Sequence, residues 1–154
     1  MRPIRLIVLA LLAGALVAGC GGGSGSKDAF SKDYRAVNDQ LLQLGETVGR
    51  ALQSAPQTSD AMLAGEFSGF ATQLDEVKGR LDGLKPPADL RPRVDALSTA
   101  VAALSKDLRD IAHAATVHDT TRAREATQAL VRDSRTVRNA RRALARETGA
   151  KVGS

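Results

Sequence analysis

The chain has 154 residues, of which 43% are hydrophobic but only 3% are aromatic, and it contains no tryptophan and one cysteine. This length suits one domain with a core of aliphatic side chains, and a single cysteine excludes an intrachain disulfide. The net charge is +5, yet residues 21–118 carry −2 and residues 119–154 carry +5. Because the net positive charge is confined to the two ends, the composition excludes a uniformly basic nucleic-acid-binding protein.

The first twenty residues combine Arg2 and Arg5 with an apolar run over 4–17 and small residues ahead of Cys20. Residues 4–17 number 14 and include Arg5, so the run is shorter than the roughly 20 apolar residues that a transmembrane helix needs. The pattern therefore predicts a cleaved N-terminal signal over residues 1–19. An ordinary secretory signal and an uncleaved membrane-spanning helix are the alternatives.

The residues Val17-Ala18-Gly19-Cys20 resemble the lipobox of bacterial lipoproteins. The resemblance implies cleavage between Gly19 and Cys20, a diacylglycerol on the Cys20 thiol, and an acyl chain such as palmitate on the new amino terminus. It also implies an extracytoplasmic, lipid-anchored location: the outer leaflet of the plasma membrane, or the periplasmic side or outer membrane of a Gram-negative cell. We expect residues 20–27, in which Gly and Ser follow Cys20, to be a flexible tether.

A helical bundle is predicted over residues 28–149, because four segments space their apolar residues alternately by four and three. The expected helices span residues 28–55, 60–84, 88–117 and 119–148, and a tail follows at 150–154. Breaks are marked by Pro56, Pro86-Pro87 and His118-Asp119, and Gly149 ends the last helix. The apolar seam of the last helix is interrupted, so we expect that helix to be the least firmly packed.

Four helices of about 25 residues joined by short breaks indicate an all-α, up-down-up-down four-helix bundle. The alternative is a set of long helical hairpins that dimerise. In the bundle, the tethered start of the first helix, the Lys85-Pro86-Pro87 loop and the C-terminus share one end, which we expect to face the membrane. The loops near Pro56 and His118 lie at the opposite end.

The last helix carries a basic series, and five of its members are candidate contacts to anionic lipid headgroups or cell-wall polymers: Arg135, Arg138, Arg141, Arg142 and Arg146. Positive charge near the end of a helix also complements the helix dipole. The pattern is therefore compatible both with a solvated basic face and with an anion-binding surface.

The two histidines, His113 and His118, are five residues apart. They therefore lie about 140° apart on a helix, which does not suit a shared metal site. A haem held without covalent attachment by one histidine and Met62 is an alternative. The carboxylates expected on outward positions form no hydrolase pattern with a histidine or serine; they are Asp39, Glu46, Asp75, Glu76, Asp82, Asp107 and Asp110. We therefore expect no catalysis, no resident cofactor or metal, and no nucleic-acid binding.

Two further patterns bear on function. Three Gly-x-x-x-Gly steps, at Gly45/Gly49, Gly65/Gly69 and Gly79/Gly83, indicate close helix approach, room for a hydrophobic ligand, or only a Gly-rich composition. The element Leu81-Asp82-Gly83-Leu84-Lys85-Pro86-Pro87, ahead of a Leu-rich helix, resembles small helical lipoproteins of actinobacteria that have no assigned activity.

We therefore expect a non-catalytic envelope lipoprotein whose bundle binds an unknown envelope protein or has a structural role. The alternatives are a carrier that holds a hydrophobic ligand or haem within the bundle, and an accessory subunit of an enzyme.

Overall fold

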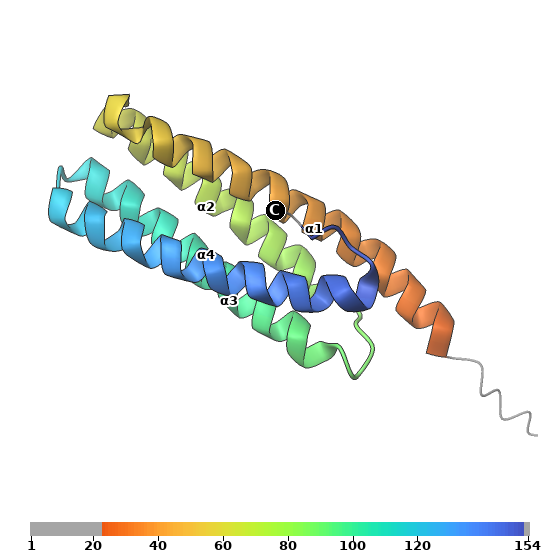
Figure 1. The fold of residues 1–154 in the computed structure, drawn as a ribbon. Helices are drawn as coiled ribbons and strands as arrows, with labels where there is room; N and C mark the ends of the chain where they lie inside the picture. Colours follow the sequence, from red (N-terminus) through yellow and green to blue (C-terminus); the bar gives the residue numbers. More distant parts are fainter. Residues whose placement is uncertain (1–22, 153–154) are drawn as a thin grey trace, which may run out of the picture.

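The computed structural model describes residues 23–152, which fold into four long antiparallel helices (Figure 1). The elements are α1 (Gly23–Ser54), the short 3-10 helix η1 (Ala55–Gln57), α2 (Asp60–Asp82), α3 (Arg91–Thr116) and α4 (Thr120–Thr148). α1 packs against α2 and α4, and α3 packs against the same two helices. The predicted all-α, up-down-up-down four-helix bundle is therefore confirmed.

The predicted apolar seams form one continuous core between the four helices. The seven apolar residues of α1 that alternate in spacing by four and three are all buried: Phe30, Tyr34, Val37, Leu41, Leu44, Val48 and Ala51. In α2, the seam is buried from Phe67 to Leu81, while Leu63 and Leu84 at its ends are partly buried. The core also contains most of the seam residues of the other two helices: Leu90, Val94, Leu97, Val101, Leu108, Ile111, Ala126, Leu130, Val137 and Leu144.

The helix ends follow the capping residues of the sequence. The Ser59 side chain accepts a hydrogen bond from the Met62 backbone N–H at the start of α2, and the Asp119 side chain accepts one from the Arg122 N–H at the start of α4. Gly149 ends α4 with a left-handed φ of 64°, a conformation that glycine adopts without steric cost. The predicted end of the last helix at Gly149 is thus confirmed.

Three helix bounds differ from the expected ones by more than one residue. α1 begins at Gly23, so residues 23–27 of the expected tether are helical. Once the buried part of a helix has formed, each further residue adds a hydrogen bond at a cost of only about 1 kcal/mol even for Gly. α3 begins at Arg91 rather than Ala88, because Pro92 lacks an N–H and suits the first turn. α2 ends at Asp82, two residues early.

Helix α1 lies farther from its neighbours than the other helices do, and α4 buries only six of its 29 residues. α3 lies close to both α2 and α4, whereas α1 makes far fewer close backbone contacts with either of its neighbours. The buried positions of α3 include small residues such as Ala100, Ser105 and Ala112, while α1 buries Phe30 and Tyr34. Small side chains let two helix axes approach, and large ones hold them apart.

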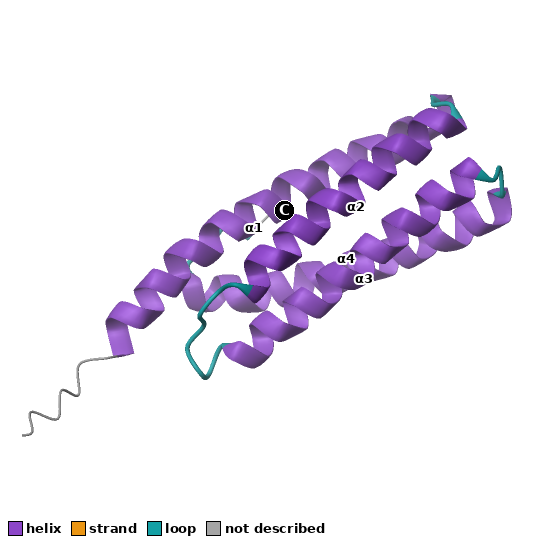
Figure 2. Ribbon diagram, turned by 180° about the vertical axis from the view of Figure 1, so that it is seen from behind, coloured by secondary structure: helices purple, strands orange, loops and turns teal. Residues whose placement is uncertain are grey.

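The start of α1, the α2–α3 connection and the end of α4 lie at one end of the bundle (Figures 1 and 2). η1 and the α3–α4 turn lie at the opposite end, as the topology predicted. The expected signal peptide and Cys20 fall outside the described residues, as do residues 153–154. Within residues 23–152, no helix combines the length and the apolar character needed to cross a membrane.

The glycine steps do not mark close helix contacts. A Cβ atom added at Gly45, Gly49, Gly65, Gly69 or Gly79 would meet no atom within 4 Å. Close approach of helices at these five positions is therefore excluded, and these glycines lower the helix stability without a compensating contact.

We expect Gly69→Ala to raise the free energy of unfolding by about 0.8–1 kcal/mol, because alanine loses less backbone entropy within a helix. Gly149→Ala is the matched control. The φ of Gly149 is 64°, and a Cβ atom added there would lie 3.2 Å from Arg35 Nη2, so that variant should be less stable than the wild type. Urea unfolding followed by circular dichroism measures both. A loss of stability in Gly69→Ala would show that this position does contact a neighbour.

Candidate binding surface

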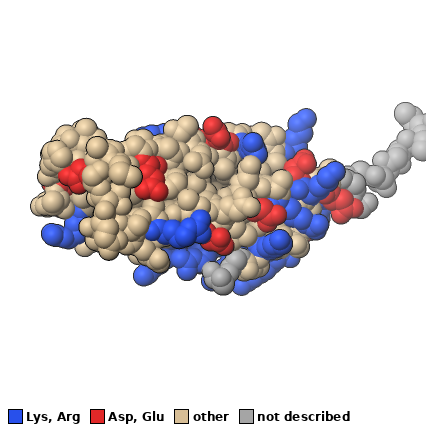
Figure 3. Space-filling model, turned by 90° about the horizontal axis from the view of Figure 1, so that it is seen from above, with Lys and Arg blue, Asp and Glu red and all other residues tan. Residues whose placement is uncertain are grey.

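The outer side of α4 presents a continuous row of basic side chains, which we call the arginine face. Its members are all exposed: Arg124, Arg132, Arg135, Arg138, Arg142 and Arg146. At 3.6 residues per turn they fall within an arc of about 120°, and at 1.5 Å per residue they extend over about 33 Å. Basic side chains accordingly gather along one long edge of the molecule (Figure 3).

The arginine face is not neutralised by neighbouring carboxylates. None of its six guanidinium groups lies within 4.0 Å of an Asp or Glu of the described residues. Two acidic residues of α4 turn towards α3 instead: Glu147 pairs with Arg93 at 2.9 Å, and Asp133 faces Asp107. Glu125 lies at the edge of the arc. The face is therefore a surface of uncompensated positive charge.

Arg141, one of the five candidate anion contacts, does not belong to this face. Its half-buried side chain donates from Nε to Oδ1 of Asn38 on α1 at 3.1 Å. The hydroxyl of Tyr34, also on α1, donates to the backbone carbonyl of Arg141 at 3.4 Å. Burial lowers the pKa of Arg141 and raises the pKa of Tyr34 to about 12, although the charge of Arg141 opposes the rise at Tyr34. Arg141 thus joins α1 to α4.

Hydrogen bonds from Arg35 and Asn38 of α1 also hold the C-terminal end of α4 and the residues that follow it. Arg35 donates from Nε and Nη2 to the carbonyl of Thr148, at 3.1 and 2.8 Å. The Asn38 side-chain amide donates to the carbonyl of Lys151 at 3.1 Å. Positive donors suit the carbonyl end of a helix, where the dipole is negative. These bonds hold the end of the arginine face next to the start of the chain's first helix.

Serine–aspartate pairs occupy the α2–α3 interface. The buried Ser105 hydroxyl lies 2.8 Å from Asp75 Oδ1 and 3.1 Å from the Ala71 carbonyl, and Arg109 also pairs with Asp75. Ser98 donates to Asp82 Oδ1 at 2.5 Å. Hydrogen bonds from Lys78 and Ser98 hold the pKa of Asp82 below its usual value. No histidine takes part in either pair, so the arrangement satisfies buried hydroxyl groups and joins the helices.

Asp107 points inward, so the expectation that it lies on an outward position is wrong. Its side chain is only 6% exposed, its Oδ2 has no hydrogen-bond partner among the described residues, and it faces Asp133 across the α3–α4 interface. Burial, the charge of Asp133 and a hydrogen bond between the two carboxyl groups raise the pKa of Asp107 to about 6. The neighbouring Lys106 opposes this rise, and Asp110 adds to it. Two carboxyl groups this close do not both ionise easily.

The histidines lie apart and make different contacts. His113 is exposed on α3, and Nδ1 of His118 lies 2.5 Å from Asp60 Oδ2 at the start of α2. His118 has a positive φ of 55° in the α3–α4 turn, and Met62 is 67% exposed. Among the described residues, no three His, Cys, Asp or Glu side chains come together as a metal site would require.

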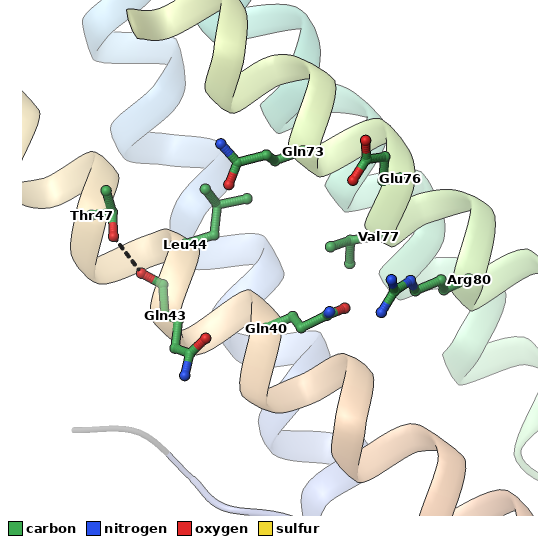
Figure 4. A pocket seen from close by; sticks show the side chains of 8 residues that line it. All are labelled: Gln40, Gln43, Leu44, Thr47, Gln73, Glu76, Val77 and Arg80. Carbon is green, nitrogen blue, oxygen red and sulfur yellow. Dashed lines mark hydrogen bonds between the residues drawn. The ribbon is translucent and has the colours of Figure 1, made fainter.

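A polar cleft lies between α1 and α2, where the looser packing of α1 leaves space of about 290 Å³. Figure 4 shows its side chains: Gln40, Gln43, Leu44, Thr47, Gln73, Glu76, Val77 and Arg80. Thr47 donates to the Gln43 carbonyl at 2.9 Å, and Gln40 Oε1 has no partner among residues 23–152. A second hollow of about 370 Å³ lies beside the α2–α3 connection and is lined by Lys85, Arg91 and Asp95 among others. Both hollows are open; the first is largely polar, whereas the second is lined about equally by polar and apolar groups.

Comparisons with models of known protein families, with curated proteins and with solved structures gave no match to this chain.

We expect the free energy of unfolding to fall as the pH rises from about 4 to about 6. In this range the folded chain keeps the Asp107 proton, while an unfolded Asp with a pKa near 3.8 has lost it, so the folded state binds more protons. Asp107→Asn should abolish this fall in the free energy of unfolding with rising pH. At pH 7 it should raise the free energy of unfolding by about 1–2 kcal/mol, because the amide is neutral and can donate to Asp133.

Urea unfolding at several pH values measures the effect of Asp107→Asn. Asp110→Asn is the matched control on the same helix, since it removes a carboxylate that pairs with Lys106 near the surface. Asp110→Asn should change the free energy of unfolding by at most about 0.5 kcal/mol and leave its dependence on pH unchanged. If Asp107→Asn is instead less stable at pH 7, the charged form of Asp107 is favourable in the folded protein.

Proposed function

We propose that the chain is a non-catalytic, lipid-anchored protein of the bacterial cell envelope, and that its bundle is a binding or structural module. The observation that carries this proposal is the position of the only cysteine. Cys20 follows an apolar segment and small residues that resemble a lipobox, and it stands three residues ahead of Gly23, where α1 begins.

The arrangement of the helices is consistent with anchoring at Cys20. Three residues of extended chain reach at most about 10 Å, so a lipid on Cys20 would hold the start of α1 close to the bilayer. The same end of the bundle carries the α2–α3 connection and the end of α4. Lys27 of α1 lies 4.0 Å from Glu147 of α4. An anchored bundle would therefore keep the C-terminal part of the arginine face near the membrane.

A binding role is favoured over catalysis and over transport of a ligand inside the bundle. The serine hydroxyls that contact Asp75 and Asp82 lie between helices and have no histidine beside them. The core positions are filled by packed side chains, and the two hollows described above are open to the surface, whereas a lipid tail or a haem needs an enclosed, mainly apolar pocket. The arginine face offers the bundle's clearest surface for an anionic partner.

The anchor is tested by mass spectrometry of the protein from its native membrane. We expect a mature chain that begins at Cys20 and carries a diacylglyceryl group, because the thiol of Cys20 is the expected site of attachment. Cys20→Ser should retain residues 1–19 or leave the membrane fraction. Gly22→Ser, which leaves Val17–Cys20 intact, is the control and should be processed like the wild type. Unmodified Cys20 in a chain released to the medium would overturn the proposal.

A further inference from the structure

We infer that the arginine face of α4 binds the anionic headgroups of the membrane that carries the anchor, so that the bundle lies with one long side on the lipid surface. The inference rests on the lipid-anchored state proposed above and adds to it the partner and the orientation of the bundle.

The shape of the arginine face suits a lipid surface. Six exposed guanidinium groups follow the outside of one straight helix for about 33 Å, within an arc of about 120°. The cleft between α1 and α2 and the hollow at the α2–α3 connection both lie elsewhere. A convex row of charges fits the many headgroups of a broad surface better than a single small anion. Near an anionic membrane, each arginine strengthens binding by about fivefold.

The composition of the face also favours an interface between water and lipid. Val131 lies within the same arc and is 44% exposed, one of the few large apolar side chains of the described residues that reach the surface. Arginine stems are apolar and place their charged ends at headgroups while the stems contact less polar material. A wall polymer would supply anions but no apolar layer for Val131.

The arginine face is placed so that it can contact the headgroups while the lipid on Cys20 is inserted in the same bilayer. Arg146 lies one residue before Glu147, which is within 4.0 Å of Lys27 near the start of α1. Arg35 and Asn38 fix this end of α4 to α1. A lipid that holds the start of α1 at the bilayer therefore holds one end of the arginine face there too, and the bundle only needs to tilt for the remaining arginines to reach the headgroups.

Chemical modification of arginines by phenylglyoxal, followed by peptide mass spectrometry, tests the orientation on the full chain. The protein is purified from its membrane and reconstituted into vesicles of phosphatidylcholine alone or of phosphatidylcholine with phosphatidylglycerol. We expect Arg135, Arg138, Arg142 and Arg146 to react several-fold more slowly on the phosphatidylglycerol vesicles only. The exposed Arg50 of α1 and Arg80 of α2 should react equally on both. Protection should be lost in 1 M salt, where the screening length falls to about 3 Å.

Charge-reversal variants distinguish an effect of the arginine face from an effect of the net charge of the protein. Arg135→Glu with Arg142→Glu should abolish the protection of Arg138 and Arg146, whereas Arg50→Glu with Arg80→Glu, which changes the net charge equally, should preserve it. Equal reactivity of the face on both kinds of vesicle would overturn the inference. So would protection that appears only in intact envelopes, which would indicate a wall polymer or a protein. The peptide containing Cys20 is read in the same spectra, so failure of the anchor is seen separately from failure of the face.

Discussion

Helix α3 is packed against α2 on one side and against α4 on the other, and the remaining features of the bundle follow from this double contact. It requires a buried arc on α3 that is wider than one apolar seam, and small residues such as Ala100 and Ser105 occupy positions where neighbouring backbones approach. A hydroxyl buried there needs a hydrogen-bond partner, because an unpaired one costs about 1–3 kcal/mol. The Ala71 carbonyl and Asp75 supply partners to Ser105, and carboxylates of α2 thereby become part of the interface.

Helix α1 completes the bundle by a different kind of contact. Its large seam residues hold it further from its neighbours, and side chains such as Arg35, Asn38 and Tyr34 bridge it to α4. These bonds concentrate at the end where α1 begins and α4 finishes. The helix that follows Cys20 is thus fixed to the helix that carries the positive charge, so a lipid attached to Cys20 would restrain the position of the arginine face as well.

The periodic parts of this fold were predictable from the sequence, and the exceptions have physical causes. Seam spacing, prolines and capping residues located the four helices, because helix periodicity and helix ends depend on local sequence. Asp107 and Arg141 were misplaced, since a three-four spacing marks one seam and does not show that a helix buries a second side against another neighbour. Both polar groups lie between helices, and only the packing of distant segments determines which side of each helix is covered.

A lipid attached at a single point would leave the bundle free to tilt and rotate, because one short chain segment constrains a position and not an orientation. A row of charges parallel to the long axis supplies the second constraint. With α4 on the lipid surface, α2 points outwards, because it packs against α1 and α3 but not closely against α4. The polar cleft between α1 and α2 then opens away from the membrane. The orientation on the lipid surface would therefore determine which part of the bundle an envelope partner meets, namely the glutamine-lined side.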